Sequence, residues 1–178
     1  MGDQTVEVKW TLAADAAFKT VVNAGTEVAH PGRGHAVHVE LTGLQPGRPY
    51  WYRFEAGGVR SPVGRTRTLP TVGAATDSFK LAWVSCQHFE QGFFNAYKDM
   101  VAWSPDLILH LGDYIYESSF GQQVRRHPNL DPRTLDDYRV HHAVYKLDAD
   151  LQAAHAAAPW ALIWDDHDVG GLQVGVQL

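Results

Sequence analysis

The sequence predicts two classes of structure in one chain, a β-sandwich over residues 1–76 and an α/β domain over residues 77–178. Two observations support this prediction. The first part concentrates β-forming residues between Gly and Pro turns, as an all-β domain does. The second part alternates short apolar segments with amphipathic helical segments, which is typical of βαβ units.

Three strands are expected in the first part, at residues 6–10, 35–41 and 50–54. The segment from Leu41 to Tyr52 resembles the fibronectin type III pattern, in which the tyrosine of a strand packs back on the preceding turn as a tyrosine corner. A complete sandwich of this type has seven strands in about 100 residues. We therefore expect residues 1–76 to form an incomplete fibronectin type III-like domain that lacks one or two opening strands.

The second part is expected to hold three strands and three helices. The strands are predicted at residues 79–84, 106–111 and 160–164, and the helices at residues 93–103, 135–147 and 148–157. Thr134, followed by Asp137, predicts a capped start for the middle helix. Strands connected through helices run parallel, and ligands of open α/β sheets bind beyond the carboxyl ends of the strands. A site is therefore expected where these strands end.

Composition limits the function classes. The chain has 178 residues, 45% hydrophobic content and a formal net charge of -5. Scattered Lys and Arg argue against a nucleic-acid-binding surface, and no segment approaches the roughly 20 apolar residues of a membrane span. The first residues lack the features of a signal peptide, so the chain as written is expected to stay inside the cell. One cysteine excludes an internal disulfide and leaves Cys86 as either a small core residue or a ligand.

A carboxylate and a phenol follow the second predicted strand. Asp113 can bridge two cations through its two oxygens, and Tyr116 becomes a good ligand only as phenolate, which requires a highly charged metal because its reference pKa is near 10. Ferric iron fits this requirement best. The alternatives are that Asp113 caps a turn and that Tyr116 lies on a sheet face.

Two other strand ends carry ligand-type side chains. Cys86 follows the first strand, and Asp166 and His167 lie among three carboxylates after the third, where the charges would repel one another unless cations or donors compensate them. His88 is expected at the surface. Arg125 and Arg126 can meet a phosphate group, or else are solvated loop charges.

In combination these segments resemble the PhoD-type alkaline phosphatase (alkaline phosphatase D / phospholipase D) family of the calcineurin-like metallophosphatase superfamily. The resemblance covers about residues 5–169, and the segments that carry it are Ser85–Gln87, Leu111–Glu117, Thr134–Arg139, Ala154–Trp160 and Trp164–Val169. It implies hydrolysis of phosphate monoesters and phosphodiesters at a site that holds iron (Fe3+) and calcium (Ca2+). It also implies that residues 77–178 are the N-terminal part of a catalytic α/β/β/α sandwich.

The same resemblance implies roles for single residues. Cys86 and Tyr116 would be the thiolate and phenolate ligands of ferric iron, Asp113 would bridge the two metals, and Asp166 would bind the second.

For catalysis, the resemblance implies that His167 touches the substrate phosphate or protonates the leaving oxygen. Asp168 would orient that imidazole. Independently of the resemblance, the basic pair Arg125 and Arg126 is the candidate for binding the substrate phosphate.

After Val169 the chain departs from the family pattern, and the export signal that the family carries is absent from its start. We therefore expect an N-terminal fragment with weak metal binding and impaired hydrolysis. The alternative is a non-catalytic remnant or a binding module with a degenerate metal site. Neither the natural substrate nor the oligomeric state follows from the sequence.

Overall fold

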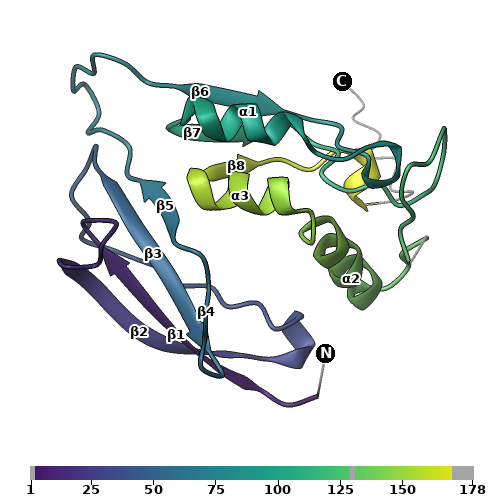
Figure 1. Cartoon of the computed structure of the whole chain (residues 1–178), viewed down its shortest axis with the longest axis horizontal. Coiled ribbons are helices and arrows are strands. Elements are labelled where there is room, and N and C mark those ends of the chain that lie inside the picture. Colours follow the sequence, from purple (N-terminus) through teal and green to yellow (C-terminus); the bar gives the residue numbers. More distant parts are fainter. Residues whose placement is uncertain (1–2, 129–130, 170–178) are drawn as a thin grey trace. The chain divides into compact units, whose positions relative to one another are not determined.

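The computed structural model describes residues 3–128 and 131–169. These residues fall into two compact units. The first unit contains residues 3–79 and the short segment 156–159, and the second contains residues 80–155 and 160–169. Figure 1 shows the course of the chain through both units. Among the described residues, no helix is both long and apolar enough to cross a membrane.

The first unit is built on a five-stranded antiparallel sheet with the order β2-β1-β3-β4, in which β5 also pairs with β3. The strands are β1 (Val6–Ala13), β2 (Val21–Ala29), β3 (Pro49–Ala56), β4 (Val59–Arg60) and β5 (Gly64–Arg67). The strands predicted at residues 6–10 and 50–54 are confirmed as parts of β1 and β3. In the register of the sheet, Trp10 lies opposite both Gly25 and Phe54.

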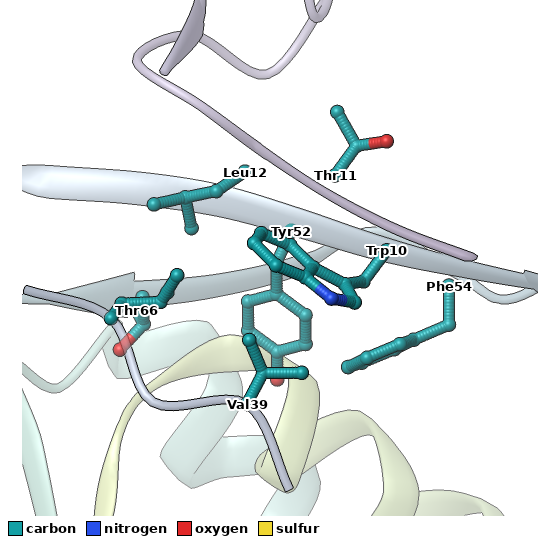
Figure 2. Close-up of a pocket in the computed structure, with 8 residues that line it drawn as sticks. Trp10, Thr11, Leu12, Val39, Tyr52, Phe54 and Thr66 are labelled. Carbon is teal, nitrogen blue, oxygen red and sulfur yellow. The ribbon is translucent and has the colours of Figure 1, made fainter. Parts of the chain in front are cut away.

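The strand predicted at residues 35–41 is wrong, because this segment forms no ladder with any described strand. Its side chains alternate in burial as the sequence pattern indicates, but a strand also needs a neighbour for its backbone hydrogen bonds. Val39 and Leu41 instead line an open apolar hollow of about 340 Å³ in the first unit. Figure 2 shows Val39 facing the rings of Trp10 and Tyr52 across this hollow.

The predicted tyrosine corner is present at the start of β3. The Tyr50 side chain is 2% exposed, and its hydroxyl oxygen accepts a hydrogen bond from the Gln45 backbone N–H at 2.8 Å. This bond ties the turn before β3 to the strand itself, as the local pattern predicts. That the unit is a fibronectin type III-like sandwich stays a prediction.

The second unit contains a three-stranded parallel sheet with the order β6-β7-β8. Its elements are β6 (Leu81–Val84), α1 (Ala96–Trp103), β7 (Leu107–His110), α2 (Leu135–Tyr145), α3 (Ala149–Ala157) and β8 (Trp160–Leu162). Each lies within or next to the range expected from the sequence, and the predicted parallel pairing is confirmed. The capping box at Thr134 is also confirmed, because its side chain accepts from the Asp137 N–H while the Asp137 carboxylate accepts from the Thr134 N–H.

The helices cover one face of this sheet. Tyr97 of α1, Tyr145 of α2 and Leu151 of α3 belong to one buried cluster, against which Val84 and Trp160 of the sheet pack. The neighbouring strand residue, Trp83, points to the opposite face and is 66% exposed. The strand ends, rather than the covered face, carry the polar residues of interest.

Candidate metal centre

Backbone hydrogen bonds hold the three strand ends of the second unit together. The Leu111 N–H donates to the Val84 carbonyl at 2.8 Å, and the Ile163 N–H donates to the His110 carbonyl at 3.0 Å. One step further on, the Cys86 N–H donates to the Gly112 carbonyl at 3.2 Å. The loops after β6, β7 and β8 therefore start side by side, as the sequence predicts for parallel strands.

The backbone adopts unusual conformations at two candidate ligands. Cys86 has φ of 58° and Asp113 has φ of 56°, both in the left-handed region that side chains with a Cβ disfavour. Gly112 has φ of 102°, and a Cβ at this position would lie 2.5 Å from the Asp165 Cβ. Strained backbone of this kind persists only where the surroundings over-determine it, and it clusters at functional sites.

The side chains of Cys86, Asp113 and Tyr116 converge on one carboxylate oxygen. Asp113 Oδ2 lies 3.5 Å from Cys86 Sγ and accepts a hydrogen bond from the Tyr116 hydroxyl at 3.1 Å. Asp113 is 7% exposed and Tyr116 is 8% exposed, whereas Cys86 is exposed. Cys86 is therefore not a small core residue, which was one of the two interpretations that the sequence left open.

The other carboxylate oxygen of Asp113 provides a test of whether a cation fits. Oδ1 is buried and has no hydrogen-bond partner among the described residues, and a buried charged oxygen without a partner is costly. One ligand atom each from Asp113, Asp166 and His167 lies within 4.8 Å of the others. Carboxylate, thiolate and phenolate are anionic donors, so this group of residues fits a highly charged cation.

Without a cation, the Tyr116 phenol stays protonated. Burial, followed by hydrogen bonds with Cys86 and Asp113, raises the pKa of Tyr116 well above its usual value near 10. The phenolate form that a metal ligand requires is therefore accessible only when a positive charge is placed beside it.

Asp168 has a different place from the one predicted. Its Oδ2 accepts from the backbone N–H groups of Asp113 at 2.8 Å and Asp165 at 3.0 Å, and its Oδ1 accepts from that of Ile115 at 3.0 Å. The side chain is 6% exposed. This carboxylate therefore joins the loops after β7 and β8 and fixes the backbone of Asp113.

The imidazole of His167 contacts Glu117 instead. His167 Nδ1 lies 2.9 Å from Glu117 Oε2, and the His167 ring packs on the Tyr116 ring with 4.3 Å between their centroids. Burial alone would lower the pKa of His167, but the hydrogen bond and charge of Glu117 outweigh it and raise that pKa above 6.5. The prediction that Asp168 orients this ring is corrected, since both Asp168 oxygens bind backbone N–H groups.

Comparisons with known proteins identify the family. The family model described as PhoD-like phosphatase matches residues 81–170, and the model of the PhoD-like phosphatase N-terminal domain matches residues 1–70. The chain belongs to the PhoD-like phosphatase family. This membership agrees with the resemblance found in the sequence.

Two relatives of this PhoD-like chain are much longer than it is. Alkaline phosphatase D of Bacillus subtilis (strain 168) is 48% identical over 175 residues, which cover 95% of the chain and 30% of the relative. A solved structure of PhoD is 47% identical with a TM-score of 0.91, and the match covers 96% of the chain and 34% of that structure. The chain thus spans about a third of the length of the relatives it matches.

The two arginines of the PhoD-like chain differ in environment. The Arg125 side chain is 14% exposed, donates to Asp148 Oδ2 at 2.8 Å and lies over the Phe89 ring at 3.7 Å from its centroid. These contacts use its charge within the fold, whereas Arg126 is exposed. His88 was expected at the surface but is 8% exposed, with its ring 4.6 Å from that of Tyr116.

Sequence reasoning missed Glu117 as a member of this cluster. Glu117 stands directly after Tyr116 in the sequence. A carboxylate next to a candidate ligand is a usable clue, because histidines in such sites commonly donate their second ring N–H to a carboxylate. The pairing with His167 becomes visible only when the loops after β7 and β8 are brought together.

Proposed function

We propose that the second unit carries part of the metal site of a phosphoric ester hydrolase that cleaves phosphate monoesters or phosphodiesters. The observation that carries this proposal is the convergence of Cys86, Tyr116 and Asp113 at the strand ends, with one buried Asp113 oxygen left without a partner. Membership of the PhoD-like phosphatase family supports it. The proposal includes residues 77–178 as the N-terminal part of a metallophosphatase α/β/β/α sandwich, preceded by a fibronectin type III-like domain over residues 1–76.

We assign the candidate ligands to two cations, as the family resemblance implies. Cys86, Tyr116 and Asp113 would hold Fe3+, and Asp113 and Asp166 would share Ca2+. Two such metals would polarise the phosphoryl oxygens and lower the pKa of a water enough for it to act as the nucleophile. The short distances between the ligand atoms support the assignment.

The other residues of the cluster act on the substrate and on the loops. His167 would contact a phosphate oxygen or give its Nε2 proton to the leaving oxygen, since its raised pKa favours the protonated ring. Asp168 would act as a positioning residue that fixes the Asp113 backbone. Arg126, which is exposed, would attract the substrate phosphate, whereas the contacts of Arg125 favour a structural role.

Titration of the purified 178-residue chain with Fe3+ tests the metal assignment. We expect a visible charge-transfer absorption band from bound phenolate, lost in Tyr116→Phe and shifted in Cys86→Ser. Tyr138→Phe, on α2 in the same unit, is the matched control and should keep the band. A folded chain that binds Fe3+ without this band would contradict the assignment, and one that binds no metal would favour a non-catalytic remnant or binding module.

Hydrolysis of a chromogenic phosphodiester tests the activity. We expect a rate close to background for the 178-residue chain, and metal-dependent turnover for a protein in which this segment is continued to the length of its relatives. Removal of the metals with a chelator should abolish that turnover. A rate unaffected by the chelator would contradict the proposal.

A further inference from the structure

Glu117 and His167 form a pair that the proposed function does not explain. The two side chains come from different loops, after β7 and after β8, and their side chains are 25% and 29% exposed. The distance between His167 Nδ1 and Glu117 Oε2 is 2.9 Å, which is that of a charge-assisted hydrogen bond. Such a bond ties Glu117, which lies outside regular structure, to His167 in the short 3-10 helix Asp166–Val169.

The chemistry of the two groups decides which ring nitrogen carries the proton. An ionised carboxylate has no proton and can only accept, so the bond to Glu117 requires a hydrogen on His167 Nδ1. The nitrogen that remains for any other partner is Nε2. In the neutral ring Nε2 then bears the lone pair, and in the charged ring it bears the second proton.

Aromatic packing fixes the plane of the same ring. The His167 and Tyr116 rings have centroids 4.3 Å apart and an interplanar angle of 33°, and the Phe120 ring lies 6.1 Å from His167 at 29°. With one face packed and Nδ1 held, the ring has little freedom to turn. A His167 atom also lies within 4.8 Å of carboxylate oxygens of Asp113 and Asp166.

We propose that Glu117 is the positioning residue of His167: it keeps a hydrogen on Nδ1, so that Nε2 is the nitrogen left for the substrate and, in the protonated ring, donates its N–H to a phosphate oxygen at the candidate metal centre. This inference rests on the proposed function for the use of Nε2, and on the observed pairing alone for the tautomer. Glu117 itself touches no reacting atom. Its effect is to set which nitrogen of His167 meets the substrate, as carboxylate partners do for histidines at metal sites.

The test is the tautomer of His167 in the metal-free 178-residue chain, labelled with 15N-histidine. Long-range 1H–15N correlation spectra distinguish Nδ1–H from Nε2–H, and His167→Gln identifies the His167 resonances. At a pH where the ring is neutral we expect Nδ1–H to dominate, although free histidine favours Nε2–H. Glu117→Ala should reverse the tautomer ratio, and Glu117→Gln should keep it because its amide oxygen also accepts.

The controls separate positioning from folding. The resonances of the other histidines should stay unchanged in both variants, because Glu117 is partly exposed and outside regular structure. A wild-type ring in the Nε2–H form, or a Glu117→Ala spectrum identical to wild type, would overturn the proposal. Absence of the ferric band from the wild-type chain would refute the proposed function and leave this result standing, so the two failures are distinguishable.

Discussion

The two units of the chain satisfy their polar groups in different ways. In the first unit the strands pair antiparallel, and side-chain pairs such as Arg60–Glu55, 2.8 Å apart, lie exposed on adjacent strands. In the second unit two carboxylates at the strand ends are buried, since Asp113 and Asp168 are 7% and 6% exposed. A parallel strand must end in a loop, whose N–H groups need acceptors from side chains. That requirement brings carboxylates to the place where ligands bind.

The largest expected effect comes from Asp168→Ala. The change leaves the buried N–H groups of Asp113 and Ile115 and the part-buried one of Asp165 without acceptors, so we expect a loss of about 4 kcal/mol of unfolding free energy. Hydrogen–deuterium exchange should accelerate in β6, β7 and β8 more than in β1 and β3. Equal acceleration in both sheets would show that the units unfold together, and would contradict the difference between the two units.

A matched pair of glycine substitutions, one in each unit, tests the difference between the two units. At Gly112, Ala would place a Cβ 2.5 Å from the Asp165 Cβ in a backbone with positive φ, and we expect a loss of about 3 kcal/mol. At Gly64, the nearest atoms belong to the Tyr52 ring, which can move into the hollow it lines, so about 1 kcal/mol is expected. Urea unfolding measures both values.

Binding of Fe3+ should distinguish the same two variants. Gly112→Ala is expected to weaken it, because the added Cβ pushes apart the loops that carry Asp113 and Asp166. Gly64→Ala should leave it unchanged. Similar losses of binding in both variants would indicate that the candidate centre depends on the first unit as much as on the second.

Acid should weaken the second unit through two half-buried histidines, His142 and His155. Burial lowers the pKa of both His142 and His155 to about 4, whereas the unfolded value is about 6.5. Stability from these neutral rings is therefore present above about pH 6.5 and is lost as the pH falls toward 4. Between pH 7 and pH 5 we expect about 2 kcal/mol per histidine from these shifts.

His155→Gln isolates one of these contributions. It should reduce the dependence of unfolding free energy on pH over that interval, while the Gln side chain can still accept from the Tyr114 hydroxyl that lies 2.7 Å from His155 Nε2. Urea unfolding at several pH values is the measurement. An unchanged pH dependence would mean that His155 does not titrate as its burial indicates.

The smallest expected effect belongs to the first unit. Tyr50→Phe removes one hydroxyl that accepts from the Gln45 N–H and leaves the buried ring in place, so we expect a loss of about 1 kcal/mol. Exchange should accelerate in the turn before β3. Altered exchange in the loops of the candidate centre would contradict the separation of the two units.

Local sequence patterns were sufficient where the determining contacts are local. Apolar runs predicted β6, β7 and β8, Thr134 with Asp137 predicted the start of α2, and Tyr50 predicted its own bond to the turn before it. The prediction of a strand at residues 35–41 was wrong. Alternation of apolar and polar residues indicates which side chains face inward, but it does not show whether a partner strand is present.

The candidate site was predictable in part for the same reason. The rule that parallel strands end at one edge brought Cys86, Asp113 and Asp166 together in advance. It did not show that Asp168 would accept from backbone groups, that Glu117 would reach His167, or that Arg125 would be held by Asp148, because each of these contacts joins loops far apart in the sequence. The environment of such side chains depends on how the loops close.

The left-handed backbone at Cys86 and Asp113 has a consequence for libraries of variants. Gly adopts such φ values without strain, so a screen of these two positions for thermal tolerance alone should enrich Gly at the expense of the native residues. A screen for metal retention should do the opposite and keep Cys and Asp. Positions at which the two screens enrich different residues would identify the candidate metal centre from residue frequencies alone, without knowledge of the substrate.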